Sequence, residues 1–230
     1  MANRPVYISL AEKPFYKIAN TEFEFFSGFS IQQKQRSIKS LHDAFLLSCP
    51  NNKVLEVSRK SPLQIGNKLS AFNLKYRMNG KYYPVECLFQ GSKVFENGKV
   101  YQDLYERQPG EAKKDERLKN SGRIVGFKLD NTDFESEPKD FFYNWLYINA
   151  LNNDENIGKE LLEYDSFTDI EFNPKKSINC QAIAVAIYVG LVKSNNLEEA
   201  LKSPEEFRKV VYGLDNTKKD YQQMNLFDFM

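Results

Sequence analysis

The chain has 230 residues, of which 41% are hydrophobic and 14% aromatic, so it can bury one sizeable core. Its formal net charge of +1 excludes strong long-range attraction to DNA, and any contact with a duplex must therefore come from a local basic patch. The longest apolar run, 182–192, is too short to cross a bilayer, and the N-terminal segment lacks the hydrophobic region of a signal peptide. We expect a soluble, cytoplasmic protein with no membrane partner.

The first quarter of the chain predicts four elements: strands at Val6–Ile8 and around Phe23–Phe26, a helix over 30–48, and a strand over 53–57. Ser30 and Gln33 have the spacing of a capping box at the start of the helix. The apolar residues of the helix recur on one face, namely Ile31, Ile38, Leu41 and Phe45. This face should pack on the strands.

The same helix carries His42, the single histidine of the chain, which we expect on the helix surface. One histidine excludes a histidine-rich metal cluster and argues against a serine or cysteine triad. The three cysteines, Cys49, Cys87 and Cys180, have no C-x-x-C spacing, so we expect reduced thiols that serve packing. The sequence therefore predicts no metal site and no cofactor, and acid–base chemistry must fall to carboxylates and lysines.

The segment 83–95 combines polar and apolar residues in a pattern that predicts a helix from Pro84 to Asn97, closed by Gly98. At about 100° per residue, Glu86, Gln90 and Lys93 fall within roughly 60° of one another. A carboxylate and an amine would then face one space about 10 Å apart, within reach of one bound ligand. The alternative is a solvated helix face, although aromatic flanks on both sides argue for burial.

A later helix is predicted to begin at Pro138, because Phe141, Trp145, Ile148 and Leu151 recur on one side. Trp145 could stack on a nucleobase or ribose, but its spacing favours core packing. Two further helices should follow Asn179, the second opened by Ser203-Pro204 and stopped at Gly213. These elements predict an α+β fold, mainly helical, with a few short strands in a single compact domain over 1–213.

A second polar group lies between these helices, where Asp169 and Glu171 occupy alternate positions. If 169–172 is extended, both carboxylates point to one side. Lys175 and Lys176 then approach the helix that begins near Asn179, whose free amides favour anions such as a diphosphate. The alternative is a solvated turn before a capped helix.

The segment 111–123 is the best candidate for a local basic patch, but its acidic residues dilute the positive charge. We expect it to be solvated surface, with DNA contact as the alternative. A ligand with its own anionic diphosphate needs only a few lysines and a helix end, so affinity can reside in such a ligand more than in the DNA.

Several of these segments resemble the NADAR family, whose members read roughly L-S-x-F, then an aromatic residue before V-E-x-x-x-Q-x-x-K. The matching residues are Leu69-Ser70-Ala71-Phe72-Asn73, the hairpin-like Met78–Tyr83, Val85-Glu86, Phe89-Gln90, Lys93, Asp169-Ile170-Glu171 and Asn179-Cys180-Gln181. The resemblance spans about 54–194 and leaves 1–52 as an N-terminal extension. Arg4–Ile8, Gly28–Ser30 and Phe167–Ser177 more closely resemble the NADAR antitoxins that are paired with DarT-type toxins.

The resemblance implies a function. Such toxins attach ADP-ribose to guanine in DNA, and these antitoxins are hydrolases that remove it. In the resembling family the lysine and glutamate of the signature segment belong to the active site, and here they are Lys93 and Glu86. Lys93 could form a Schiff base with the ribose while Glu86 transfers protons. Alternatively, Glu86 could act with Asp169 or Glu171 through an oxocarbenium-like transition state.

The resemblance also implies a set of ligand-binding residues around ADP-ribose and ADP-ribosylated DNA, namely Ser70, Phe72, Phe89, Gln90, Trp145, Lys175, Lys176 and Asn179. Two other functions stay open. One is a metabolic N-glycosidase acting on a phosphorylated ribosyl intermediate, against which the extended N-terminal region, Ala71 and the lack of a tryptophan-glycine before the final helix argue. The other is a non-catalytic module that binds ADP-ribosylated nucleic acid or the cognate toxin.

The last residues, 214–230, are expected to form a flexible tail. Within it, Gln223, Met224, Leu226 and Phe227 resemble the peptide by which bacterial replication and repair proteins bind the sliding clamp. Two large apolar anchors would fill a pocket while the glutamine sets the register. The alternative is that these apolar residues fold back onto the domain.

Overall fold

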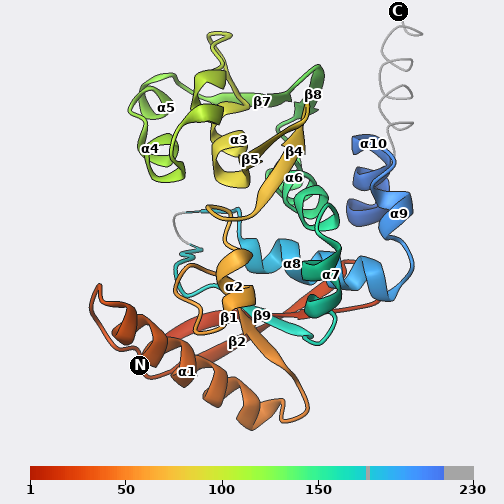
Figure 1. Cartoon of the computed structure of the whole chain (residues 1–230). Helices are drawn as coiled ribbons and strands as arrows, with labels where there is room; N and C mark the ends of the chain where they lie inside the picture. Colours follow the sequence, from red (N-terminus) through yellow and green to blue (C-terminus); the bar gives the residue numbers. More distant parts are fainter. Residues whose placement is uncertain (175–176, 215–230) are drawn as a thin grey trace, which may run out of the picture.

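The computed structural model describes residues 1–174 and 177–214 (Figure 1). It confirms the predicted α+β class with short strands. The largest sheet has the order β2-β1-β9-β3 and consists of β1 Ala2–Ser9, β2 Tyr16–Phe23, β3 Val54–Glu56 and β9 Ser166–Thr168. β1 is antiparallel to β2 and β9, whereas β3 runs parallel to β9. The N-terminal extension 1–52 therefore contributes strands to the central sheet.

Two helices cover opposite faces of this sheet, α1 (Ile31–Ser48) and α8 (Gln181–Lys193). Val6 and Ile8 of β1 pack with the apolar face of α1, whereas Tyr7 belongs to the larger core that includes α8. This division follows from the alternation of side chains along a strand. The Oγ of Ser30 accepts a hydrogen bond from the backbone N–H of Gln33 at 3.2 Å, so α1 begins as predicted.

A second part of the fold contains the signature segment. Strands β4 (Lys75–Met78) and β5 (Lys81–Pro84) form a hairpin through Asn79 and Gly80, whose φ angles of 51° and 79° suit a tight turn of type I′. The other elements are α2 (Gln64–Lys68), α3 (Val85–Gly91), η1 (Gln102–Glu106), α4 (Pro109–Lys114), α5 (Arg117–Asn120), and a sheet of β6 (Lys93–Phe95), β7 (Ile124–Leu129) and β8 (Thr132–Glu135).

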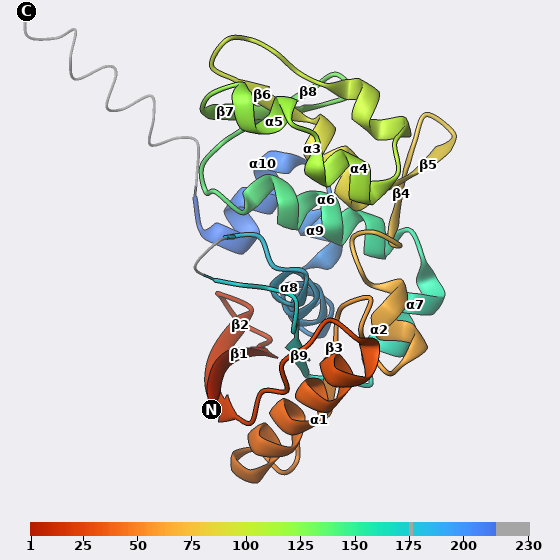
Figure 2. The same cartoon turned by 90° about the vertical axis from the view of Figure 1, so that its left-hand side faces the viewer.

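Helix α6 (Phe141–Asn152) links the two parts, because it contacts both α3 and α8. Figures 1 and 2 show α6 and α8 between the sheet that holds β1 and the part that holds α3, α4 and α5. Nine of the twelve residues of α6 are buried, as expected for a largely apolar helix that lies between two layers. The remaining elements are α7 (Glu155–Leu161), α9 (Leu197–Ala200), α10 (Pro204–Phe207) and the π-helical turn η2 (Arg208–Tyr212).

The final helical segment follows the prediction closely. The Oγ of Ser203 accepts a hydrogen bond from the backbone N–H of Glu206 at 3.2 Å, and Pro204 occupies the first turn of α10. Gly213 stops the segment with a φ of 69°, in the left-handed region where glycine carries no steric cost.

The predicted helix over Pro84–Asn97 is wrong in its second half. Helix α3 ends at Gly91, and strand β6 begins at Lys93. A Cβ on Gly91 would lie 2.6 Å from the ring of Tyr105, so glycine permits this close packing where the helix stops. The following residues pair with β7, Lys93 opposite Phe127 and Val94 next to Gly126 in the register. Strand pairing with a distant segment has overridden the local helical pattern.

Three smaller expectations also need correction. Strand β2 ends at Phe23, because the backbone N–H and C=O of Phe26 bond the Oγ of Ser37 instead of a neighbouring strand. Residues 170–171 form a turn rather than an extended strand. His42 is half-buried in the described structure, and its Nε2 lies 2.9 Å from the Oγ1 of Thr168.

Some expectations concern residues outside the described ranges. These are Lys175, Lys176 and the clamp-like residues Gln223, Met224, Leu226 and Phe227. Within the described ranges, no helix combines the length and the apolar character needed to span a bilayer.

Candidate active site

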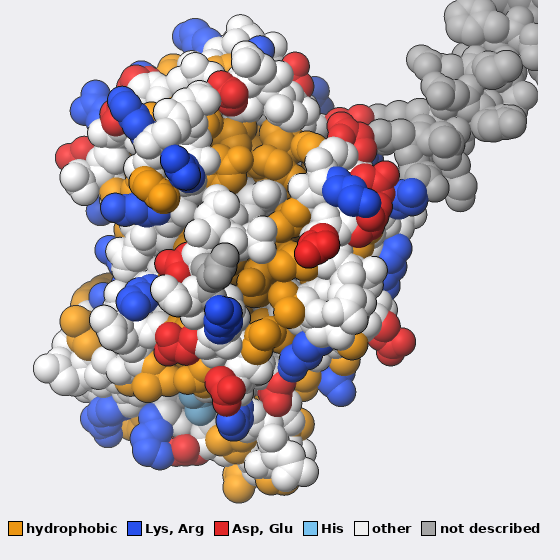
Figure 3. Space-filling model, turned by 45° about the vertical axis from the view of Figure 1, so that its right-hand side comes forward, with side chains coloured by type: hydrophobic (Ala, Val, Ile, Leu, Met, Phe, Trp, Pro, Cys, Tyr) orange, Lys and Arg blue, Asp and Glu red, His pale blue; other side chains and the backbone are white. Residues whose placement is uncertain are grey.

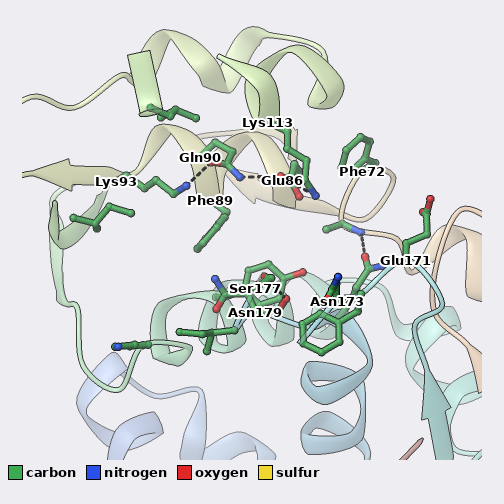
Figure 4. A pocket seen from close by; sticks show the side chains of 18 of the residues that line it. Phe72, Glu86, Phe89, Gln90, Lys93, Lys113, Glu171, Asn173, Ser177 and Asn179 are labelled. Atoms are coloured by element: carbon green, nitrogen blue, oxygen red, sulfur yellow. Dashed lines mark hydrogen bonds and ion pairs between the residues drawn. The ribbon is translucent and has the colours of Figure 1, made fainter. Parts of the chain in front are cut away.

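A cavity of about 1550 Å³ lies between the two parts of the fold. One wall comes from α3, β6, α4 and α5, and the other from the loop after β9 and the start of α8. In Figure 4, Glu86, Gln90 and Lys93 line one side, while Asn173, Ser177 and Asn179 lie across from them. The two polar groups singled out in the sequence therefore face the same space.

A chain of hydrogen bonds joins the carboxylate and the amine of the signature segment. The Nζ of Lys93 donates to the Oε1 of Gln90 at 2.5 Å, and the Nε2 of Gln90 donates to the Oε1 of Glu86 at 2.9 Å. Glu86 and Gln90 share one face of α3, as the helical spacing predicts. Lys93 reaches the same space from the first residue of β6. The side-chain amide of Gln90 thus holds both the Lys93 amine and the Glu86 carboxylate in place.

The environment of Lys93 favours a neutral amine. Burial is the largest cause that lowers its pKa, to about 8, and the nearby positive charge of Lys113 acts in the same direction. The negative charge of Glu86 opposes this shift. An amine with a pKa of about 8 is roughly one-tenth neutral at pH 7. Because the neutral form carries the lone pair, Lys93 can act as a nucleophile.

Lys113 approaches the carboxylate of Glu86 from α4. Its Nζ lies 3.7 Å from the Oε1 of Glu86, and the side chain of Glu86 is only 7% exposed. The same Nζ lies 5.4 Å from the centre of the Phe72 ring, and the guanidinium of Arg59 lies 4.2 Å from that ring. Phe72 lines the cavity, and its ring contacts these two cations.

Asp169 lies on the other wall, where strand β9 has ended. Its Oδ1 accepts from the backbone N–H groups of Glu171 and Phe172, at 3.0 and 3.1 Å, and its Oδ2 accepts from Gln181 at 3.1 Å. Burial raises the pKa of this carboxyl despite these bonds. Glu171 is exposed at the rim of the cavity, so the two carboxylates do not act as the predicted parallel pair.

Gln181 connects the two walls, a role that the sequence had not suggested beyond the start of a helix. Its Oε1 accepts from the backbone N–H of Ala71 at 2.7 Å, and its Nε2 donates to the C=O of Val57 at 2.8 Å as well as to Asp169. The C=O of Ala71 in turn accepts from the N–H of Glu86 at 2.9 Å. A shift at Asp169 is thereby coupled to the first turn of α3.

A buried polar network lies behind Asp169. The carboxyl of Glu56 accepts from Ser58 and Thr168, both at 2.6 Å, and from the backbone N–H of Ile170 at 2.9 Å. Burial raises the pKa of Glu56, and the nearby charge of Asp169 adds to this effect. Through Thr168 the network reaches His42, whose pKa burial lowers to about 4. The network therefore holds the turn that carries Asp169.

The other predicted ligand-binding residues divide into two groups. Ser70, Phe89, Gln90 and Asn179 line the cavity. The Oδ1 of Asn179 is buried and has no hydrogen-bond partner in the described structure, so it is available to a donor on a ligand. Trp145 lies elsewhere, with its ring centre 4.8 Å from that of Phe134, and packs in the core as its spacing favoured.

The segment 111–123, expected to be solvated surface, in fact forms part of the cavity. Lys113, Lys114, Lys119 and Arg123 line it from α4, α5 and the residues that follow. These four side chains are exposed to solvent, as expected, and they also line the open side of the cavity. Among the described residues, no three or more His, Cys, Asp or Glu side chains come close enough to hold one metal ion.

Comparison with known proteins identifies the family of the chain. A family model described as DarT1-associated NADAR antitoxin matches residues 2–221. A comparison with curated proteins found no significant match. The family match covers both walls of the cavity and the central sheet. The chain therefore belongs to the family of DarT1-associated NADAR antitoxins.

Proposed function

We propose that this antitoxin is a glycohydrolase that removes ADP-ribose from guanine in DNA in the cytoplasm. Its family pairs it with a DarT-type toxin, and the resemblance described above implies that such toxins modify guanine in DNA. The observation that carries the catalytic part is the half-buried Lys93, with a lowered pKa and a link through Gln90 to Glu86, on the wall of a large cavity.

In the proposed reaction, the ribose ring bound to the guanine amine opens to an imine at its anomeric carbon. The neutral Nζ of Lys93 attacks this carbon, and the bond to the guanine nitrogen breaks as that nitrogen receives a proton. Water then attacks the resulting Schiff base and releases Lys93, and the free sugar closes again to ADP-ribose. One water is consumed and one glycosidic bond is broken. Glu86 carries the protons between these steps.

A mechanism with carboxylates alone is less well supported by the contacts. Both oxygens of Asp169 already accept hydrogen bonds from the backbone and Gln181, which suits an anchor better than a nucleophile. Glu171 lies at the exposed rim of the cavity, where water screens its charge. Glu86 is buried and accessible to the cavity, but it needs a second reacting group. Lys93 is the reactive side chain that hydrogen bonds through Gln90 link to Glu86.

The direct test is incubation of the purified chain with an oligonucleotide that carries ADP-ribosylated guanine. Free ADP-ribose and unmodified oligonucleotide are measured by mass spectrometry. We expect both products from the parent, and strong loss of both with Lys93→Ala or Glu86→Gln. Lys99→Ala is the matched control, because Lys99 is exposed and does not line the cavity.

Circular dichroism and thermal melting should show that each variant keeps the fold. Tight binding of the modified oligonucleotide without release of ADP-ribose would favour the non-catalytic binding module. Release at the parent rate by both cavity variants would refute the assignment of Lys93 and Glu86.

A further inference from the structure

The cavity wall formed by Lys113, Lys114, Lys119 and Arg123, called here the α4–α5 wall, carries more positive charge than the sequence suggests. The acidic residues that dilute the segment 111–123 fall into two groups. Glu111 and Glu116 are exposed and do not line the cavity. The charge that faces the cavity is therefore decided by the fold rather than by composition.

The remaining acid of this wall, Asp115, forms an ion pair with Arg117, which is shared with Asp103. The Nε of Arg117 donates to the Oδ1 of Asp115 and its Nη2 to the Oδ2, both at 2.9 Å. The guanidinium also donates to both oxygens of Asp103, at 3.2 and 2.7 Å. These contacts hold the pKa of the Asp115 carboxyl below its usual range and fix α5 against η1. Arg117 thereby engages both oxygens of Asp115, so within the described residues this carboxylate forms no ion pair with Lys114 or Lys119.

Lys114 and Lys119 differ from Lys113 in their partners. Lys113 is shared with Glu86, whereas neither Lys114 nor Lys119 forms an ion pair within the part of the chain that the structure describes. Both side chains are exposed at the mouth of the cavity. Figure 3 shows that basic and acidic side chains intermingle on the face it presents, in keeping with a net charge of +1. Arg123 forms an ion pair with Glu96 at 3.9 Å, so Lys114 and Lys119 are the two cations of the wall whose charge is left to attract a polyanion.

The dimensions of the cavity point to a ligand larger than one nucleotide. Its volume of about 1550 Å³ exceeds the range of roughly 300–1,000 Å³ for small-molecule sites. The opposite wall includes Asn179 and Gln181 at the N-terminus of α8, a helix of 13 residues whose positive dipole end favours an anion such as a diphosphate. If the diphosphate binds that wall and the ribose reaches Lys93, the lysines of α4 and α5 remain in the same cavity for the strand attached to the guanine.

We propose that the α4–α5 wall binds the backbone phosphates of the DNA strand that carries the modified guanine. This inference rests on the proposed function for the identity of the substrate. Lys114 and Lys119 contact phosphates next to the reacting nucleotide and position the strand without reading its sequence. A single strand suits the site better than a duplex, because a stacked and paired guanine would first have to be extruded.

The experiment compares a double variant, Lys114→Ser with Lys119→Ser, with a control of equal charge, Lys17→Ser with Lys68→Ser. Lys17 and Lys68 are exposed and do not line the cavity. Two substrates are used, a modified single-stranded oligonucleotide and the ADP-ribosylated 2′-deoxyguanosine obtained from it by digestion with a nuclease and a phosphatase. Binding of the unmodified oligonucleotide is measured in parallel by fluorescence anisotropy at several salt concentrations.

We expect the wall variant to show a KM for the oligonucleotide raised about tenfold, with unchanged hydrolysis of the nucleoside. The salt dependence of log Kd for the unmodified oligonucleotide should weaken by about 1.4, or about 0.7 for each lost phosphate contact. The control variant should match the parent in every assay. Equal loss on both substrates would overturn the proposal, because the wall would then hold the diphosphate of ADP-ribose.

Two other results would also overturn it. One is an unchanged KM together with an unchanged salt dependence, and the other is lost binding of the toxin while binding of the oligonucleotide is kept, which would assign the wall to a protein partner. If neither substrate is hydrolysed by the parent, the proposed function fails. The anisotropy measurement then still decides whether the wall binds a DNA strand.

Discussion

The lowered pKa of Lys93 gives the most detailed prediction, because three described features set it. Burial lowers the pKa from 10.5 to about 8, Lys113 lowers it and Glu86 raises it. At pH 7 this shift increases the neutral fraction of the amine from about 0.03% to about 10%, which corresponds to about 3 kcal/mol. Lys113→Met should raise the pKa of Lys93, since it removes a cation and leaves Glu86 unpaired. Glu86→Gln should lower it further.

Each charge change should shift the pKa of Lys93 by about half a unit to one unit, as expected for separated charges in a medium of intermediate dielectric constant. The assay is competitive labelling with trace acetic anhydride from pH 6 to 11, followed by mass spectrometry of the peptide that contains Lys93. The labelling curve should have its midpoint near 8 in the parent and move in opposite directions in the two variants. Lys99→Met, at an exposed position outside the cavity, should leave the curve unchanged.

A midpoint above 10 in the parent would mean that Lys93 is an ordinary ammonium at neutral pH and that burial does not lower its pKa. Shifts of the same sign in Lys113→Met and Glu86→Gln would show that the two charges do not act on Lys93 as the geometry implies. The measurement needs no substrate, and its outcome is therefore independent of the proposed reaction.

Other predictions follow from the buried groups. The folded state of the parent binds a proton at Glu56 more tightly than the unfolded state, so this contribution to stability is present below pH 4.5 and lost as the pH rises to about 8. The free energy of unfolding of Glu56→Gln, measured by chemical denaturation, should therefore rise relative to that of the parent over this pH window, by up to about 1.4 kcal/mol per pH unit. A difference that stays constant with pH would contradict the raised pKa of Glu56. Gln181→Glu keeps an acceptor for Ala71 but sets a second carboxylate against Asp169. Its activity relative to the parent at the same pH should therefore be low at pH 7 and partly restored near pH 5, where the new carboxyl is protonated; an equal relative loss at both pH values would count against this positioning role. Addition of a chelator should leave activity unchanged, and complete loss that Mg²⁺ restores would mean that carboxylates such as Asp169 and Glu171 hold a metal.

Local patterns in the sequence predicted those features that depend on neighbours along the chain. The caps at Ser30 and Ser203 were correct, because each side chain bonds a backbone N–H three residues later. The shared face of Glu86 and Gln90 was also correct, since residues four apart on a helix are adjacent. The predicted length of this helix was wrong, because β6 pairs with β7, whose residues lie about thirty positions further along the chain.

Contacts between distant segments explain the rest of what the sequence did not reveal. Gln181 bonds Ala71 across 110 positions, and His42 contacts Thr168 across 126 positions. The sequence marks Gln181 only as a polar residue at the start of an apolar helix. Its hydrogen-bond partners cannot be predicted from the sequence, because they are distant along the chain. Asp169 bonds backbone amides of its own turn, so the alternating carboxylates never form the predicted extended pair.

The central claim is that Lys93 forms a covalent bond with the ribose during hydrolysis. Borohydride is added while the parent acts on the modified oligonucleotide, and the protein is digested and examined by mass spectrometry. We expect reduction of the Schiff base, with ADP-ribose fixed to the peptide that contains Lys93. The variant Lys93→Arg should give no adduct and have no activity. Full activity of Lys93→Arg, together with no trapped adduct in the parent, would contradict the claim and favour carboxylates alone.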